Sequence, residues 1–397
     1  MNQRLCRRQG IRVVWGTALL MAAQPVAAAG AACQNASLVR LEANYIKACQ
    51  YLRTGDRASG AINNVYGAPT WVVPRENALA ILGLIRATEC LGDSSYRSRA
   101  QQAMAYLLKV QDADGGWFDQ YNYATPFIRS KSPTQTAEVM IALNKLGYQK
   151  SQYNAMVKAA EFLLRLQNPA NKTGQDDGLI GGGFDDTGHY QTWRWTSDNA
   201  FAYQALKAAA RWARTKGDAA RQLRYDDAAV RLLDGINSVL RDSASAVWYV
   251  VVDAQDVPVP NRPHEWINYA PQMLDVPAEG VGDPAVGEWI HQTLVHQPEG
   301  AAVWNDGPQN NRLSPGYSFQ ASLAWVDLNQ TAYKDAAWQW ANASGLHQVT
   351  PDANGIAGGW IDWAETTGAN AQWWERFIDT SFYAIVTATG GYNFSAE

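Results

Sequence analysis

The strongest constraint on the fold of this chain is an alternation between two kinds of helical segment. Apolar residues recur at helical spacing in twelve segments, and strand-type alternation is almost absent. Six segments carry a charged face, which requires contact with water, and the six between them are apolar or small on every side, which favours burial all round. The segments with a charged face are 38–53, 94–111, 151–167, 220–241, 283–296 and 331–345. The uniformly apolar segments are 76–91, 134–147, 197–214, 265–275, 317–327 and 378–388. We therefore expect an all-α protein in which an outer ring of helices encloses an inner ring.

The lengths of the links between these segments predict a working face. A link from an apolar segment to the next charged one is short, as in Leu91-Gly92-Asp93, whereas the links in the other direction are long. The long links are 54–75, 112–133, 168–196, 242–264, 297–316 and 346–377. Because the helices alternate in direction, all long links fall on one face, where the inner helices begin. Long loops on a rigid scaffold are where sites are usually built.

The long links share glycines followed by an aromatic residue. The segment from Gln111 to Trp117 resembles the Q-x3-G-x-W repeat of squalene-cyclase-type α/α toroids. Six alternating hairpins over residues 38–390 resemble the six-hairpin glycosidases and the related pectin- and alginate-degrading lyases. This resemblance implies an (α/α)6 toroid of six helical hairpins forming one catalytic domain over residues 30–397. It brings no family-specific catalytic signature, so activity has to be argued from the site.

The first 29 residues are typical of an export signal. Arg4, Arg7, Arg8 and Arg12 precede an apolar stretch, and small residues before Gly30 offer a cleavage site. We expect a mature protein that is secreted or periplasmic; a lipid anchor on Cys33 is the less favoured alternative. No segment is long and apolar enough to span a membrane. We also expect a monomer.

The mature cysteines predict one disulfide. Cys33 lies just before the first helix and Cys90 near the end of the second, and these ends are neighbours in an antiparallel hairpin. Cys49 lies on the apolar stripe of its helix and is expected to be a buried thiol. No Cys/His spacing resembles a zinc site. Neither a metal nor a cofactor is expected for the reaction.

Composition indicates a carbohydrate rather than a nucleic acid as the partner. The net charge is −4, and no Lys/Arg run occurs beyond the first dozen residues. The 17 Trp and 18 Tyr residues of the chain include many in the long links. Sugar rings stack their apolar faces on flat aromatic side chains, so we expect an oligo- or polysaccharide substrate.

The catalytic carboxylates are expected within residues 176–199, where two acid pairs lead into an inner helix. Glycoside hydrolysis needs one protonated carboxyl and one carboxylate. We expect Asp198, at a helix start, to be the ionised base, and Asp186 or Asp185, beside aromatic rings, to be the acid. The alternatives are that Asp198 merely caps its helix and that the Gly-flanked pairs form turns or bind a structural calcium ion.

The expected substrate-binding residues are aromatic and polar side chains of the same face. They are Trp193, Trp195, Arg194, His189, Tyr190, His264, Tyr269, Trp363 and Trp373. Trp117 and Trp360 follow glycines and are expected instead to fill gaps between hairpins.

Three other functions fit parts of the sequence. A lyase acting on a uronic-acid polymer would use His, Tyr and Arg, and His264, Tyr269 and Arg262 supply these types. The Asn-Asn-His motif of toroidal alginate lyases is missing. Terpene-type cyclisation needs a D-x-D-D cluster, whose first Asp is missing before Asp185. A non-catalytic glycan-binding toroid would explain the tryptophans equally well. Hydrolysis is the preferred interpretation, with the lyase second.

Overall fold

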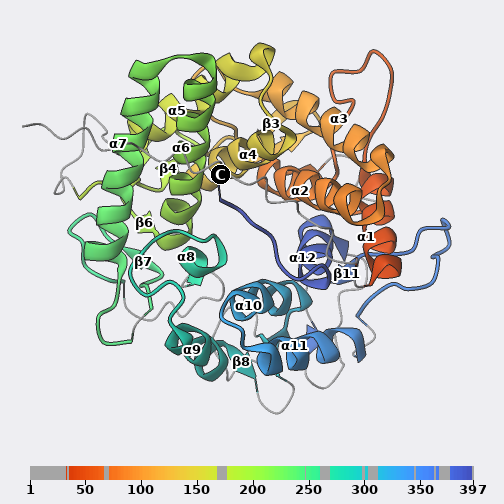
Figure 1. Ribbon diagram of the computed structural model, residues 1–397. Coiled ribbons are helices and arrows are strands. Elements are labelled where there is room, and N and C mark those ends of the chain that lie inside the picture. Colours follow the sequence, from red (N-terminus) through yellow and green to blue (C-terminus); the bar gives the residue numbers. More distant parts are fainter. Residues whose placement is uncertain are drawn as a thin grey trace, which may run out of the picture.

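The computed structural model describes residues 33, 35–66, 71–167, 177–245, 247–259, 269–296, 300–302, 312–343, 346–361, 364–365 and 376–395. In this part of the chain, helices of an outer and an inner ring alternate along the sequence (Figure 1). The outer helices are α1 (Ala36–Cys49), α3 (Ser94–Val110), α5 (Tyr153–Gln167), α7 (Ala219–Gly235), α9 (Pro284–Leu294) and α11 (Thr331–Ala343). The inner helices are α2 (Pro74–Leu91), α4 (Pro133–Leu146), α6 (Thr196–Lys216), α8 (Ala270–Met273), α10 (Pro315–Asp327) and α12 (Ile378–Ala388). A 3-10 turn (Lys150–Gln152) precedes α5, and a π-helical turn (Ile236–Leu240) ends α7.

The inner helices form a closed ring. Each contacts the inner helix before and after it in the chain, and α12 also contacts α2 (Figure 1). The predicted (α/α)6 toroid is therefore confirmed, and most helix bounds lie within a few residues of those expected. The exception is the fourth inner helix, expected over 265–275. Only its end is described, and α8 stops at Met273.

Burial separates the two kinds of helix as the sequence predicts. In α4 every residue from Pro133 to Asn144 is buried, because this helix packs against neighbours on all sides. In α7 the buried residues form one stripe, which includes Tyr225, Ala228 and Leu232. The core is thus the shared interior of the two rings, and the predicted distinction between water-facing and fully enclosed helices holds.

The long links contain short strands that tie neighbouring loops together. Most pairs join two residues of each strand, and a three-stranded sheet of order β1–β2–β3 links the first two long loops. The strands are β1 (Trp71–Val72), β2 (Gln120–Asn122), β3 (Thr125–Ile128), β4 (Gly183–Phe184), β5 (Tyr190–Gln191), β6 (Arg194–Trp195), β7 (Val251–Val252), β8 (Val295–His296), β9 (Ala301–Ala302), β10 (Arg312–Leu313), β11 (Trp360–Ile361), β12 (Ala364–Glu365) and β13 (Arg376–Phe377). Strands this short leave no periodic pattern in a sequence, and none of them is predicted.

The link after α3 shows why glycine and tryptophan recur in these loops. Gly115 has a φ of +95°, and a Cβ built on it would lie 2.0 Å from the carbonyl oxygen of Lys158 on α5. Gln111 Nε2 donates to the carbonyls of Gly115, at 2.9 Å, and of Ala155, at 3.0 Å. Trp117 is buried and donates from Nε1 to the Leu107 carbonyl at 2.8 Å. The loop is thereby fastened to the next outer helix, with Trp117 buried against α3.

The link after α5 repeats this fastening. Gln167 Nε2 donates to the carbonyl of Gly178 at 2.6 Å and to that of Ala228, on α7, at 2.9 Å. Gly178, with a φ of +77°, comes so close to α7 that a Cβ would lie 2.3 Å from the Arg231 carbonyl oxygen. Two successive hairpins are therefore joined to the next outer helix by the same contacts.

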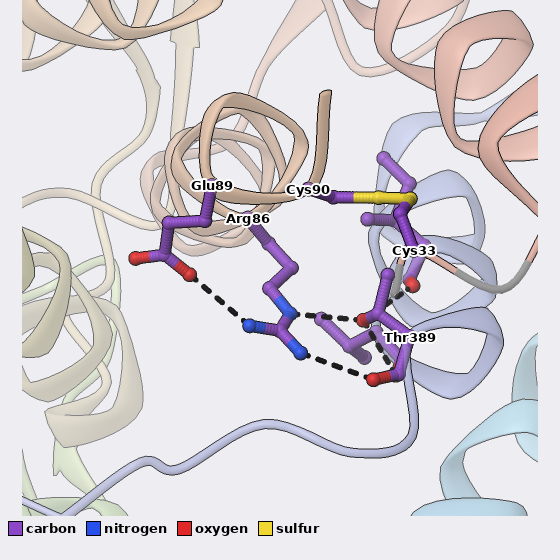
Figure 2. The surroundings of a disulfide bond; sticks show 7 residues. Cys33, Arg86, Glu89, Cys90 and Thr389 are labelled. Carbon is purple, nitrogen blue, oxygen red and sulfur yellow. Dashed lines mark hydrogen bonds and ion pairs between the residues drawn. A yellow bond between two sulfur atoms is a disulfide. The ribbon is translucent and has the colours of Figure 1, made fainter. Parts of the chain in front are cut away.

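The first and last described segments meet at the side where the inner helices finish. Cys33 and Cys90 form the predicted disulfide, and Cys49 is a buried thiol outside any disulfide, as expected. Figure 2 shows Arg86 beside this bond, donating to the hydroxyl and carbonyl of Thr389 at 2.9 and 3.0 Å. These contacts join α2 to the segment that follows α12. That segment continues across the middle of the ring in Figure 1.

A second junction closes the ring on the opposite face. Glu42, on α1, is fully buried and accepts hydrogen bonds from the Ser381 hydroxyl at 2.6 Å and the Gly359 amide at 3.1 Å. His347 Nε2 lies 2.6 Å from the same carboxyl. One buried acid thus holds the last long loop and α12 against α1. Among the described helices, none has the length and apolarity to cross a membrane.

Candidate active site

Four acids gather where inner helices begin. Glu76, Asp198 and Asp379 lie in the first turns of α2, α6 and α12, and Glu138 lies one turn further along α4. Glu138 is 2% exposed, Glu76 and Asp198 are each 8% exposed, and Asp379 is half-buried. Four carboxyls held out of water on adjacent helices are costly to ionise, so they need a physical account.

The same hydrogen-bond pattern follows two of these acids, Glu76 and Asp198. The residue after Glu76 is Asn77, whose amide group bonds the backbone of Ile62 in both directions, at 2.8 and 2.7 Å. Asn199, after Asp198, bonds the backbone of Ile180 in the same way, at 2.8 and 3.2 Å. These two long loops are therefore held against the first turns of α2 and α6, next to an acid in each case.

Arg75 lies among the acids and supplies positive charge. Its Nε lies 3.2 Å from Glu76 Oε1, and its backbone amide donates to Gln135 Oε1, on α4, at 2.8 Å. Burial alone would lower the pKa of Arg75, but the carboxyls of Glu76 and Glu138 raise it above its usual value. Arg75 therefore stays charged and favours ionisation of the acids around it.

Glu76 and Asp379 act on each other as a pair. Burial, and then the negative charge of Asp379, raise the pKa of Glu76 well above its ordinary range. Burial also raises the pKa of Asp379, against the opposing effects of Arg75 and of the Thr380 amide, which donates to Oδ1 at 2.7 Å. Two adjoining carboxyls in a shared buried site do not both ionise readily. The pKa of Glu76 is raised further than that of Asp379, so Asp379 is the member that loses its proton first.

Glu138 and Asp198 extend the same wall of carboxyls. Burial raises the pKa of Glu138 to about 8, and within the described residues its Oε2 has no hydrogen-bond partner. Burial raises the pKa of Asp198 to about 7, although the Thr134 hydroxyl donates a hydrogen bond to it. At neutral pH Glu138 is a protonated acid inside the ring. This cluster of Arg75, Glu76, Glu138, Asp198 and Asp379 is called the acid cluster below.

The surroundings of Asp198 and Asp185 shift their pKa values in directions opposite to those expected for a base and an acid. Asp198 is expected from the sequence to stay ionised, but burial raises its pKa. Asp185 is expected to be a candidate acid, but hydrogen bonds from Thr187 and from the His189 amide lower its pKa. Asp186 is exposed and accepts from the Ser130 amide at 2.7 Å. Tight Gly-flanked turns satisfy carboxylates with backbone amides, which stabilises the charged form.

Arg194 is used to hold loops together. It is 2% exposed and lies 3.0 Å from Asp177 Oδ2, and it also pairs with Asp256 and donates to the Asp253 carbonyl. These contacts join the third long loop to the fourth beside the β6–β7 pair. The expectation that Arg194 binds substrate therefore receives no support from its surroundings.

The other expected binding residues lie in different environments. Tyr190 donates to the Leu166 carbonyl at 3.1 Å, and burial raises its pKa to about 12. His189 is exposed, and its Nδ1 lies 2.7 Å from the Thr187 hydroxyl. Trp193 is 38% exposed, whereas Trp195 is half-buried and directly precedes α6.

Tyr269 is buried, and burial raises its pKa well above the ordinary range, which makes it a poor proton acceptor. His264, Trp363 and Trp373 lie outside the described residues. Their assignment remains a prediction.

Glu138 and Arg75 are absent from the residues that the sequence predicts for the site. Glu138 is the one acid in the apolar segment 134–147. A lone carboxyl inside a fully buried helix is a signal for a functional group. The sequence prediction considers an acid at a helix start and therefore does not include it. Arg75 lies just outside the expected helix bound of residue 76. Its role depends on neighbours from two other helices, α4 and α12, which no local pattern contains.

Comparison with known proteins supports the fold. No protein-family model matches the sequence, and no curated protein matches it. A D-mannose isomerase structure is 12% identical with a TM-score of 0.64, and the match covers 89% of this chain and 96% of that one. A cellobiose 2-epimerase from Bacillus thermoamylovorans B4167 is 10% identical with a TM-score of 0.62, covering 88% and 97%. An unsaturated glucuronyl hydrolase specific for heparin is 11% identical with a TM-score of 0.58, covering 89% and 95%. These neighbours are (α/α)6 toroids, and this chain shares that fold with them.

Proposed function

We propose that this protein is a carbohydrate-active enzyme that hydrolyses glycosidic bonds of an oligo- or polysaccharide at the acid cluster. The observation that carries the proposal is Glu138, a buried carboxyl on an inner helix whose pKa is raised to about 8. A glycoside hydrolase needs such an acid to protonate the leaving oxygen, together with a carboxylate on the other side of the bond. Structural neighbours named as sugar-processing enzymes are consistent with this substrate class.

The roles follow from the charge that each residue holds. Glu138 protonates the glycosidic oxygen as the bond breaks. Asp379, whose ionised form is favoured by Arg75 and the Thr380 amide against the effect of burial, acts on water or on the anomeric carbon. Asp198 acts as an accessory acid, because its charge raises the pKa of Glu138 further. Asp186 and Asp185 have no role in the reaction.

The lyase alternative is less favoured. A β-elimination needs a side chain that removes a proton next to a carboxylate, with His, Tyr or Lys as the usual base. Tyr269 and Tyr383 are buried with pKa values raised well above the ordinary range, so neither is poised to accept a proton at neutral pH.

A panel of soluble polysaccharides tests the reaction. The mature protein and Asp379→Asn are incubated with neutral and uronic-acid polymers, and both new reducing ends and unsaturated-uronate absorbance are followed. Hydrolysis predicts reducing ends without unsaturation, lost in Asp379→Asn. Unsaturated product would show that the reaction is β-elimination and not hydrolysis. A change in sugar composition without new ends would indicate isomerisation or epimerisation instead.

Export is part of the same proposal. The Cys33–Cys90 disulfide fits an oxidising compartment, where such bonds persist. Residues 1–29 lie outside the described part of the chain. The intact mass of the exported protein tests this, since cleavage before Gly30 is expected, and an uncleaved cytoplasmic chain would contradict it.

A further inference from the structure

A hollow lies among the long links, on the face of the toroid where the acid cluster lies. It has a volume of about 390 Å³ and is lined on one side by Phe118, Arg129 and Lys131, from the link between α3 and α4. Residues 184–188, from the link between α5 and α6, line the other side. We call this hollow the rim groove.

The walls of the rim groove are fixed to each other. Lys131 and Phe184 exchange backbone hydrogen bonds at 2.8 and 3.1 Å. The Ser130 amide also donates to Asp186 Oδ1, on the opposite wall, at 2.7 Å. Hydrogen bonds between the two loops therefore fix the relative position of the groove's walls.

Apolar side chains are exposed at the edge of this groove. Phe127, on β3, is 69% exposed, and its neighbour Ile128 is 37% exposed. Phe127 is the extra residue of a bulge between β2 and β3, and it precedes Arg129, which lines the groove, by two residues. The rings of Phe118 and Phe184 are half-buried in the lining. Adjoining exposed apolar residues beside a hollow rimmed by polar groups are typical of a ligand-binding groove.

The charges in the rim groove are largely satisfied within the protein. Lys131 Nζ lies 2.8 Å from Asp114 Oδ2 and also over the Phe118 ring, 4.3 Å from its centre. Asp185 accepts from the amides of Thr187 and His189, each at 2.9 Å. A lining of aromatic rings and paired charges fits a neutral, hydroxyl-rich ligand, whose apolar faces stack while its hydroxyls bond the polar groups.

One short segment of chain joins the groove to the acid cluster. Ser130 bonds Asp186 at the groove, and the Thr134 hydroxyl bonds Asp198 in the cluster. Four residue steps span at most about 14 Å. A bound oligosaccharide chain is long enough to reach from one to the other.

We propose that the rim groove is a distal subsite that binds a neutral polysaccharide chain whose reacting residue lies at the acid cluster. This proposal rests on the proposed function for the identity of the chain, and it adds the location and charge of the binding surface.

Affinity electrophoresis of the full mature chain tests the subsite. Native gels contain soluble β-glucan, mannan, xylan or, as the acidic counterpart, alginate. We expect retardation by at least one neutral polymer, and a weakening of roughly three- to tenfold in Phe127→Ala, the range expected for loss of one aromatic contact. Val230→Ala is the control, because Val230 is 56% exposed on α7 of the outer ring and does not line the rim groove, and it should run as the wild type does.

Three results would overturn the subsite: equal retardation of Phe127→Ala and wild type, no retardation by any neutral polymer, or retardation by alginate alone. The proposed function is separated from it by Glu138→Gln, which should be retarded normally yet release no reducing ends. Retardation through Phe127 without hydrolysis by the wild type would leave the subsite standing and remove the hydrolase. Hydrolysis by the wild type, with Phe127→Ala retarded as strongly as the wild type, would keep the hydrolase and remove the subsite.

Discussion

At the scale of single residues, the site depends on carboxyls that the fold keeps out of water. Glu138 is buried within α4 and has an unsatisfied oxygen in the described part of the chain. Such a group lowers stability when it ionises, and it is retained where the raised pKa is useful. The same property that makes Glu138 a suitable acid should therefore be measurable as a cost in stability.

Glu138→Gln should raise stability at pH 8 and change it little at pH 4. The pKa of Glu138 is about 8 in the folded protein, against an ordinary value of 4.5. The native state therefore holds the proton more tightly than the unfolded chain. The contribution of the neutral carboxyl is complete below pH 4.5, declines as the pH rises, and is lost above pH 8. Every tenfold difference in proton affinity between the folded and unfolded states corresponds to about 1.4 kcal/mol.

Urea unfolding of both proteins at several pH values measures this difference. Glu89→Gln is the control, because the Glu89 side chain is 53% exposed and its loss changes the net charge by the same amount. The gain at pH 8 should be confined to Glu138→Gln. Equal stabilisation of both variants, or none at any pH, would show that Glu138 is not held protonated by burial.

The residue scale is also where the sequence predicts least. Acids at the starts of inner helices are visible in it, because a helix start has a local pattern, and Asp198 and Glu76 do lie in the first turns. Protonation states are not predictable, because they depend on burial and on neighbours from other helices. Asp185 illustrates this, since a turn of its own loop lowers its pKa.

At the scale of elements, the close approach of a long loop to the next outer helix fixes the hairpin geometry. Gly115→Ala should destabilise the protein by roughly 2–4 kcal/mol, because it adds a clash with the Lys158 carbonyl to the cost of a positive φ. Gly55→Ala is the matched control, since Gly55 has a φ of +79° with nothing within 4 Å of its would-be Cβ. Thermal unfolding of both variants separates clash from backbone strain, and equal losses would contradict the account.

Helices are predictable as elements, and the strands are not. A 3.6-residue period over four turns is a strong signal, and the alternation of charged and apolar helices indicates which ring each belongs to. Strands of two residues, such as β4, arise from where two loops happen to meet, as at the Phe184–Lys131 bridge. The rim groove depends on this meeting and cannot be derived from either loop alone.

At the scale of the whole molecule, the closed ring depends on joining its two ends. The Cys33–Cys90 disulfide and the Arg86–Thr389 contacts lie together at one face (Figure 2), and the Glu42 junction lies at the other. Each brings the first hairpin against the last. The ring order follows from connecting the helices in sequence, whereas the Arg86 contact joins residues 303 positions apart and the Glu42 contact joins residues 339 apart.

Replacing Cys33 and Cys90 with serine should lower the thermal midpoint of unfolding. The bond spans 57 positions, and loop-closure entropy gives at most about 4 kcal/mol for a loop of this size. Cys49→Ser serves to distinguish loss of the bond from loss of a thiol, since Cys49 is buried and unbonded to another cysteine. A reducing agent should lower the midpoint of the wild type and not that of the double variant. An unchanged midpoint in the double variant would show that the bond contributes nothing to closure.

The central claim is that hydrolysis occurs at the acid cluster inside the ring and not at the Asp185–Asp186 turn on its rim. The most direct measurement compares the rates at which Glu138→Gln and Asp186→Asn release reducing ends from the polysaccharide that the wild type cleaves. We predict that Glu138→Gln loses roughly 10²–10⁴-fold in rate, the usual contribution of a general acid. Asp186→Asn, which keeps an acceptor oxygen for the Ser130 amide, should lose no more than the roughly three- to tenfold expected of a contact in the rim groove. Loss of activity in Asp186→Asn with Glu138→Gln still active would contradict the account and return the chemistry to the turn.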